Sequence, residues 1–554
     1  MKKFKIMPIM LAMALVIGSL SGCKSTTTTS QNETTNQNSK ETSSENKTVN
    51  IAVTTDIVSL DPLIAGDAVS LGVISNTNEG LFVVDDKEQI QPGLCEKYEV
   101  SEDALTYTFH LRDGIKWSNG DPVKAQDFVY AWQRNATSTG VLSNFQYQIE
   151  MAAIKNQADV ISGNKPVSEL GITAVDEKTI KVELDYQVPY LLNLLAFTPW
   201  APVHQSFLEA QGDQFGVTKD NALYNGPYIL SDWTTGGNKI TLTKNPDYWD
   251  AANVDVDKIV LNVIPDTQQG VMAYENGEVE NLELTGDLVS QYSSNSEFSN
   301  VPGVYNYYMM CNTKRPGLDN KNFRQAIAYA IDREALSTDV LNNGSTPAYQ
   351  MCMKGLAQNS NGEDFAEVSE QYFSLDADKA KELWEKAKTE TDCREITITY
   401  DQEVDFAANT AAFIQSALES TLDGLTVNIV ATPKKNRIAL EEAHDYDICL
   451  HRWGPDYADP TAILAMYESD HPSNYSQWKN DEFDKLYNKA NTVDAGNQEA
   501  RWEDLLKCNS ILTEDANCIP LLQTGFAVLN KSNVTGITNH MTGIKCYYKY
   551  IKKN

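Results

Sequence analysis

The sequence predicts a mixed α/β fold with at least two regions that are joined by two chain crossings. Alternating apolar and polar residues predict half-buried strands in the first half of the chain, at 49–53, 105–111, 180–184, 240–243 and 258–264. After about residue 305, apolar residues recur at helical spacing, first in Phe323, Ala326, Ile327, Ala330 and Ile331. A region inserted between crossings near 305 and 525 is typical of a hinged, two-lobed binding protein.

The remaining elements follow from local signals. Helices are predicted at 71–79, from Asp121-Pro122 through Trp132, and at 323–331, 380–387 behind a cap at Asp376, 406–418, 461–467, 483–490 and 502–512. Strands are predicted at 396–398, 425–430, 446–450, 519–522 and 526–529. The polar segment 287–300 is predicted to be a loop.

Length and charge limit the function classes. The chain has 554 residues, which corresponds to two to four domains. Its formal net charge is −31. Such an acidic balance argues against nucleic acid as a partner, because binding the phosphate backbone requires a basic surface.

The N-terminus has the anatomy of a bacterial lipoprotein signal. Three lysines precede an apolar run, 6–20, that is too short to span a bilayer comfortably, and the run ends at Leu20-Ser21-Gly22-Cys23. We therefore expect a signal peptide at 1–22 and lipidation of Cys23. Residues 23–47 are almost wholly polar, which predicts a disordered tether between a membrane and the folded body.

Eight further cysteines are scattered through the chain without a CxxC pair, so zinc-ribbon and thioredoxin interpretations fail. Disulfides are possible outside the cytoplasm, but spacing does not pair them. We also find no GxGxxG, Walker, GxSxG or HExxH motif. The six histidines lack metal-ligand spacing. The sequence therefore predicts no enzyme, no metal site and no cofactor.

One stretch, 452–460, combines aromatic residues, turn formers and two acids. Asp459 precedes Pro460, and Asp-Pro at a helix start predicts an N-cap followed by the first helical residue. Asp456 has no such local role. It follows Pro455 in a rigid loop, so its carboxylate is free to face a cationic group. Trp453 is the aromatic residue that we expect beside it.

Several motifs in sequence order resemble one family, the peptide-binding lipoproteins of ABC importers (solute-binding protein family 5). The strongest match is Glu99–Arg134, which contains Lys116-Trp117-Ser118-Asn119-Gly120-Asp121-Pro122. Further matches are Ser59-Leu60-Asp61-Pro62, Asn225-Gly226-Pro227-Tyr228, Asn245-Pro246-Asp247-Tyr248-Trp249, Asn312-Thr313-Lys314-Arg315-Pro316 and Trp453 through Pro460. The resemblance covers essentially all of 48–554.

The resemblance implies a two-lobed periplasmic-binding-protein fold with an extra N-terminal subdomain and a hinge between the lobes. It implies lobe I at 48–82, 202–306 and 522–554, an inserted subdomain II at 83–201, and lobe III at 307–521. In this family the acid at the position of Asp456 pairs with the α-ammonium of a peptide, while strand edges bind the peptide backbone. The implied ligand-binding residues are Asp456, Trp453, Gly454, Tyr457, Arg452, Ala65 and Gly66.

This chain departs from the family at two places. Enteric oligopeptide binders carry arginines shortly before the Trp453–Pro460 motif, which meet the C-terminal carboxylate of the ligand, whereas 441–450 contains none here; Arg437 and Arg452 lie nearby. An acidic ligand contact of family members falls here around Ala65-Gly66.

The implied function is an extracytoplasmic receptor that delivers oligopeptides to an ABC-transporter permease and ATPase complex. We expect a monomer that is anchored to the cell membrane through Cys23, on the cell surface or in the periplasm. Two alternatives use the same fold. One is a different cargo, such as a nickel chelate, haem or a murein peptide; the other is a receptor for signalling peptides. An extracellular hydrolase is disfavoured, because no catalytic constellation is present.

Overall fold

The computed structural model describes residues 47–542 and 544–554, and residues Asn46–Asn554 form one compact unit. The predicted signal peptide, Cys23 and nearly all of the predicted tether lie outside the described residues. Lys47 is the exception. Its ammonium lies 2.8 Å from the carboxylate of Asp255, and its backbone N–H donates to Asp257, so the last residue assigned to the tether belongs to the folded body.

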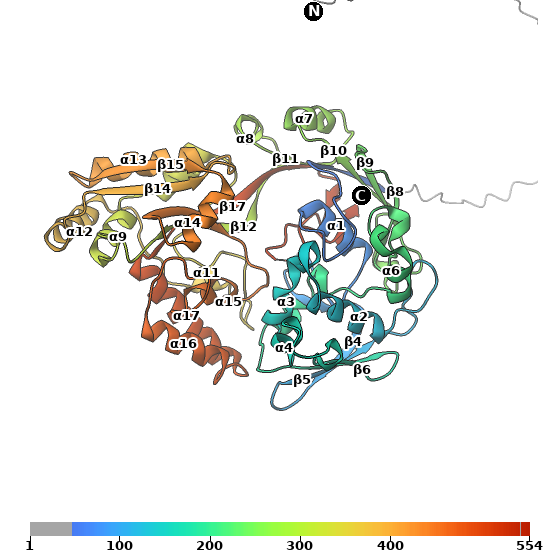
Figure 1. Ribbon diagram of the computed structural model, residues 1–554. Coiled ribbons are helices and arrows are strands. Elements are labelled where there is room, and N and C mark those ends of the chain that lie inside the picture. Colours follow the sequence, from blue (N-terminus) through green and yellow to red (C-terminus); the bar gives the residue numbers. More distant parts are fainter. Residues whose placement is uncertain (1–46, 543) are drawn as a thin grey trace, which may run out of the picture. The chain divides into compact units, whose positions relative to one another are not determined.

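The largest sheet joins eleven strands in the order β15-β14-β16-β12-β17-β11-β1-β10-β9-β8, with β13 paired to β17 (Figure 1). Its strands are β1 Thr48–Val53, β8 Tyr228–Trp233, β9 Lys239–Lys244, β10 Lys258–Val263, β11 Asn281–Leu284, β12 Phe298–Cys311, β13 Thr346–Pro347, β14 Glu395–Asp401, β15 Thr426–Thr432, β16 Ile448–Trp453 and β17 Cys518–Asn530. The fold is therefore mixed α/β, as the sequence predicts.

The long antiparallel strands β12 and β17 connect the two halves of this sheet. Residues 298–302 pair with 525–529, next to β11, and residues 306–310 pair with 518–523, next to β16. The pairing register shifts between Pro302 and Asn306. This irregularity lies where the two crossings were predicted, and it divides one half of the sheet from the other.

A separate four-stranded sheet has the order β4-β5-β7-β6, with β4 Cys95–Val100, β5 Thr106–Leu111, β6 Ile172–Ala174 and β7 Thr179–Glu183. It packs with α2 around a hydrophobic cluster of residues between Leu81 and Val203, which Tyr457 and Ala462 join. Smaller pairs are β2 Phe82–Val84 with β3 Ile90–Pro92, and β18 Val534–Thr535 with β19 Lys552–Lys553.

The helices of the first half are α1 Ala68–Thr77, α2 Ala125–Ala136, α3 Tyr147–Met151, α4 Gln157–Ile161, α5 Leu191–Leu194, α6 Gln205–Gln211, α7 Thr267–Glu275 and α8 Asp287–Tyr292. Those of the second half are α9 Lys321–Tyr329, α10 Arg333–Ala335, α11 Phe365–Val368, α12 Ala377–Glu390, α13 Ala407–Thr421, α14 Lys434–Glu442, α15 Thr461–Leu464, α16 Asp481–Asn491 and α17 Gln498–Asp515. They pack in two clusters, one around β14 and β16 and the other around α16 and α17.

Some local predictions were right and others wrong. The side chain of Asp376 caps α12 by accepting from the N–H of Lys379, as predicted. The helix expected from Asp121-Pro122 begins instead at Ala125, where the side chain of Asp127 accepts from the N–H of Lys124. The predicted loop 287–300 contains α8 and the start of β12. The helix α14 had no predicted counterpart.

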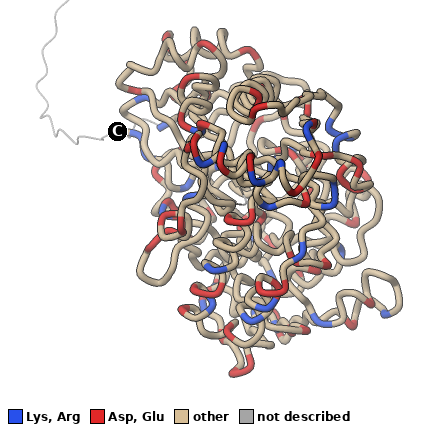
Figure 2. The backbone as a smooth tube through the Cα atoms, turned by 90° about the vertical axis from the view of Figure 1, so that its left-hand side faces the viewer, with Lys and Arg blue, Asp and Glu red and all other residues tan. Residues whose placement is uncertain are grey.

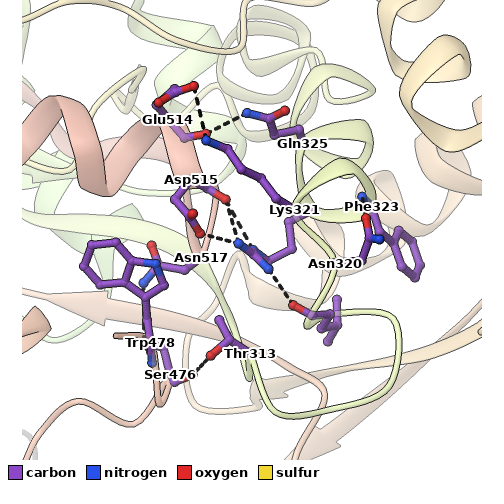
Figure 3. A network of polar contacts seen from close by, with 12 residues as sticks. Thr313, Asn320, Lys321, Phe323, Gln325, Ser476, Trp478, Glu514, Asp515 and Asn517 are labelled. Carbon is purple, nitrogen blue, oxygen red and sulfur yellow. Dashed lines mark hydrogen bonds and ion pairs between the residues drawn. The ribbon is translucent and has the colours of Figure 1, made fainter. Parts of the chain in front are cut away.

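A polar network ties α9 to the end of α17. Figure 3 shows Lys321 and Gln325 beside Glu514, to which both donate. The buried guanidinium of Arg324 donates to the carboxylate of Asp515 and, at 2.8 Å, to the carbonyl oxygen of Leu318. Because the cation has both a charged and a neutral acceptor, its burial is compensated, and the helices are fixed in register.

Charge is distributed rather than concentrated. Along the described backbone, lysines and arginines are interspersed among aspartates and glutamates (Figure 2). All eight cysteines of the described part are free thiols, and seven of them are buried. Within residues 47–542 and 544–554, no helix is both long enough and apolar enough to cross a bilayer.

Candidate functional site

The stretch 452–460 begins in a strand and ends at a helix. Arg452 and Trp453, which lie beyond the end of the predicted strand 446–450, are the last two residues of β16, which pairs with β12. The chain then turns at Gly454. A Cβ atom at this position would lie 2.9 Å from the ring of Tyr305, so only glycine fits without displacing that ring. The turn therefore places Pro455 and Asp456 just beyond the carboxyl end of β16.

Asp459 holds this turn through a buried ion pair. Its carboxylate accepts two hydrogen bonds from the guanidinium of Arg501, at 2.7 and 2.8 Å. It also accepts from the N–H of Thr461, at 3.0 Å, at the start of α15. Burial alone would raise the pKa of Asp459, but the charge and hydrogen bonds of Arg501 lower it below its usual value. The predicted contact of Asp459 with the start of the helix is present as the bond from Thr461, but Pro460 occupies the N-cap position rather than the first helical position, because α15 begins at Thr461. The ion pair with Arg501 is an addition.

Asp456 has a very different environment. Its side chain is half-buried, and the hydroxyl of Tyr147, at the start of α3, donates to its Oδ1 atom at 3.1 Å. Burial raises the pKa of this carboxyl group, and the bond from Tyr147 only partly offsets the effect. Within the described part of the chain, Asp456 joins no ion pair. The carboxylate is therefore desolvated without a compensating cation, which is an unfavourable state that a cationic ligand would relieve.

Other contacts join the same loop to the segment 186–193. The ring of Tyr457 stacks on that of Tyr190 at 4.2 Å between centroids, and the side-chain amide of Asn193 donates to the carbonyl oxygen of Ala458 at 2.8 Å. Tyr457 is only 3% exposed and belongs to the hydrophobic cluster of 81–203. Its ring thus anchors the loop rather than forming open surface.

Trp453 and Arg452 lie on opposite faces of β16. Trp453 is half-buried, its indole N–H donates to the carbonyl oxygen of Ala462 at 3.2 Å, and its ring stacks near His451 at 6.4 Å. The guanidinium of Arg452 lies over the ring of Tyr305 at 5.1 Å. In the described residues, Arg452 joins no ion pair and its side chain donates no hydrogen bond.

A buried charged network supports β16 from α14. One oxygen of Glu441 accepts from the guanidinium of Arg437 and lies 2.9 Å from Nδ1 of His451. Burial alone would raise the pKa of Glu441, but His451 and Arg437 together lower it. This network was not predicted from the sequence because α14 was not predicted. The i, i+4 spacing of Arg437 and Glu441 behind Pro433 is the signal that could have indicated the helix.

Ala65 and Gly66 lie elsewhere, in the loop before α1. Ala65 is fully buried in the cluster around β1, β9 and β10, and Gly66 is exposed. In the described structure, no hydrogen bond joins either residue to 452–457. The nearby Asp61 is already paired, because both its oxygens accept from the guanidinium of Arg134.

Comparison with known proteins identifies the family to which the chain belongs. The family described as bacterial extracellular solute-binding proteins, family 5, matches residues 89–475. The chain belongs to this family. A curated relative of this family 5 protein is the dipeptide-binding protein of Lactococcus lactis subsp. cremoris, which is 31% identical over 527 residues, 92% of this chain and 95% of the relative.

Two solved structures are similar to this family 5 protein over nearly its whole length. Listeria monocytogenes OppA bound to peptide has 32% identity and a TM-score of 0.71, over 92% of this chain and all of the other. The periplasmic murein tripeptide-binding protein MppA, in its unliganded open form, has 27% identity and a TM-score of 0.79, over 92% of this chain and 98% of the other. The two-lobed fold that the resemblance implied is confirmed.

Proposed function

We propose that this chain is an extracytoplasmic receptor that captures oligopeptides between its lobes, with the α-ammonium of the peptide bound by Asp456. The observation that carries the proposal is the half-buried carboxylate of Asp456, which has a tyrosine partner but no cationic partner among residues 47–542 and 544–554. A peptide ammonium supplies that cation, and it donates three hydrogen bonds. The names of the relatives and the peptide in the OppA structure support this ligand class.

The other proposed contacts surround this carboxylate. Trp453 and Gly454 border it, Arg452 offers an unpaired cation, and Tyr457 positions the loop by stacking on Tyr190. Gly66 is proposed to line the opposite, lobe I side, and Ala65, whose side chain is buried, is proposed to contribute there only through its backbone. The proposed division into lobe I, subdomain II and lobe III, with the residue ranges given above, is supported by hydrophobic clusters that are drawn mainly from one segment each, although Tyr457 and Ala462 of lobe III join the cluster of subdomain II.

Membership of a transporter-associated family supports the rest of the assignment. The bound peptide is delivered to an ABC-transporter permease and its ATPase, and the receptor acts as a monomer. The signal at 1–22 directs export, and lipidation of Cys23 holds the protein at the outer face of the cell membrane.

Mass spectrometry of ligands released by denaturing the purified protein tests the proposal. We expect a mixture of short peptides with free amino termini. A metal chelate, haem or a single non-peptide compound would contradict peptide capture, whereas one defined murein or signalling peptide would narrow the cargo and leave Asp456 in its role.

Replacing Tyr147 with Phe is expected to weaken binding of free-amine peptides by about tenfold, close to 1.4 kcal/mol. The hydroxyl donates to Oδ1 of Asp456 and thereby orients the carboxylate, while Oδ2 stays open to the ammonium. Isothermal titration calorimetry measures the change. Tyr186→Phe is the matched control, because this exposed tyrosine lies on the same segment as Tyr190 but, within the described structure, its hydroxyl makes no hydrogen bond to Asp456 or Asp459. Equal losses in both variants would exclude a specific role for Tyr147.

A further inference from the structure

A loop near the carboxyl end of the chain is buried, although it belongs to no helix or strand. The C-terminal loop comprises residues 536–542 and 544–547 and follows β18. The N–H of His540 donates to the carbonyl oxygen of Lys545 within it. His540 is only 2% exposed and Met541 only 4%. Connecting segments normally run over the surface of a protein, so burial of this degree indicates that the loop packs between other parts of the fold.

The C-terminal loop contacts β17 on both sides of the irregular crossing. The register shift of β12 falls opposite 523–525 of β17. At one end of this stretch, the side-chain amide of Gln523 donates to Sδ of Met541 at 3.9 Å. Beyond the other end, the ammonium of Lys545 lies 4.5 Å from the centre of the ring of Phe526. The loop therefore spans the irregularity as a third connection between the two halves of the sheet.

Met541 is the residue of the loop that reaches lobe III. A Cβ atom at Gly355 would lie 3.2 Å from Cγ of Met541, so the backbone at Gly355 packs directly against this side chain. Met541 also belongs to a hydrophobic cluster whose other buried members all lie between Tyr308 and Cys518. Its side chain is therefore inserted from the end of the chain into a core that lobe III otherwise forms alone.

His540 and Tyr547 hold the same loop to subdomain II. Nδ1 of His540 lies 2.9 Å from Oε1 of Glu88, in the turn between β2 and β3. The hydroxyl of Tyr547 donates to the carbonyl oxygen of Ala196 at 3.2 Å. Within a few residues, the loop thus contacts both of the parts that the ligand is proposed to lie between.

These two parts are in contact in this structure. Besides the contacts of 452–460 described above, the side-chain amide of Gln89, in the same turn of subdomain II, donates to Oε1 of Gln358 at 3.3 Å. Opening about the crossing separates lobe III from subdomain II. His540 and Met541 are adjacent in sequence, and each is bound to a different part. The loop therefore cannot keep both contacts when the parts move apart.

We propose that the C-terminal loop is a strap that holds lobe III against subdomain II and thereby sets the balance between the open and closed arrangements. The inference rests on the proposed division into lobes and goes beyond the proposed function, because the strap acts without touching the ligand. Its contacts through Met541 and His540 are complete only when the lobes are closed, so they stabilise that arrangement.

Two variants release the strap, one at each end. Met541→Ala removes the contact with lobe III. Glu88→Gly removes the partner of His540 but favours the turn itself, because Glu88 has a φ of 60°, which glycine adopts without strain. The matched controls are Met272→Ala, at a methionine of α7 that is 57% exposed, and Asp86→Ala, at an exposed acid of the same turn that joins no ion pair in the described structure.

Hydrogen exchange of the ligand-free protein, followed by mass spectrometry, tests the strap independently of the ligand class. We expect the amides of 452–460 to exchange about fivefold faster or more in both strap variants, because the closed arrangement is less populated, and to be unchanged in both controls. In the described structure, no hydrogen bond joins the C-terminal loop to 452–460. Faster exchange that is confined to the loop would therefore mark a local structural role and overturn the proposal, as would equal effects in the controls.

Calorimetry with trialanine and hexa-alanine supplies the second measurement. Both affinities should fall by about fivefold or more in the strap variants, and by the same factor, because only the fraction of closed protein changes. Unchanged affinity, or a loss that differs between the two peptides, overturns the proposal. A wild type that binds neither peptide contradicts peptide capture instead, and the exchange measurement then decides the role of the strap.

Discussion

Asp456→Asn is expected to weaken binding of peptides with a free amino terminus by about 2–5 kcal/mol, which is roughly 30-fold to several thousand-fold. The carboxylate is half-buried and meets no other cation in the part of the chain that the structure describes, so the bound ammonium is its charged partner. Asn has nearly the same shape but no charge, and the variant therefore isolates the ion pair. Calorimetry with one peptide and its N-acetylated form measures the effect, because acetylation removes the ammonium.

Controls make this result specific. N-acetylated peptide should bind wild type and variant equally weakly, and Asp470→Asn, at an acid that is 94% exposed, should change neither affinity. If Asp456→Asn weakened the acetylated peptide as much as the free-amine peptide, the loop would be disturbed in general and the ammonium assignment would be wrong.

The same group predicts a pH dependence. Burial raises the pKa of Asp456 in the folded protein, so the carboxyl group takes up a proton at a higher pH than an ordinary aspartate does. Affinity for free-amine peptides should fall as the pH drops through that raised pKa, and Asp456→Asn should lose this dependence.

In the ligand-free protein the folded state binds the proton more tightly, so this group's contribution to stability is lost as the pH rises through the folded pKa. Asp456→Asn should therefore not destabilise the ligand-free protein at neutral pH.

Much of the fold could be predicted because its signals are local. Strand signals located 519–522 and 526–529 on either side of the crossing near 525, whereas β12, at the crossing near 305, was not predicted. Helical spacing with a capping acid located α12 behind Asp376. The helix α14 was not predicted because its buried residues, Arg437 and Glu441, are charged, and the prediction relied on the spacing of apolar residues. Such a helix is stabilised by its buried ion network rather than by an apolar face.

The sequence indicated the two acids of the candidate site, Asp456 and Asp459, but not the side chains that contact them. The stretch 452–460 showed that Asp459 has a local capping role and that Asp456 does not. Tyr147, which donates to Asp456, is 309 residues away in the sequence, and Arg501 is 42 residues from Asp459. Both sequence separations are too long for helix or strand periodicity to predict a contact, so these contacts become visible only in the folded structure. That Arg452 contacts the ring of Tyr305 and pairs with no acid of the described residues likewise depends on the fold.

Asp459→Asn is expected to lower the free energy of unfolding by about 3–5 kcal/mol. By contrast, Asp456→Asn, three residues earlier, should not destabilise the ligand-free protein. The variant leaves the guanidinium of Arg501 buried and without a counter-charge, and it weakens the acceptor for Thr461 at the start of α15. Urea denaturation followed by circular dichroism, at several pH values, measures the difference. The pKa of Asp459 is lowered in the folded protein, so its stabilisation is complete above the unfolded pKa of about 3.9 and is lost as the pH falls through the folded value.

The double variant Asp459→Asn with Arg501→Met separates the cost of an orphaned charge from the value of the pair. Replacing both partners removes the buried cation, and such replacements are often close to neutral, so we expect the double variant to recover much of the loss. If the single variant were as stable as the wild type, the ion pair would not hold the loop.

Because the N–H of Asp459 donates to the carbonyl oxygen of Tyr457, a loop released in this way would also misplace Asp456. Asp459→Asn should then weaken free-amine and acetylated peptides alike, whereas Asp456→Asn discriminates between them, and this contrast assigns positioning to one acid and ligand binding to the other.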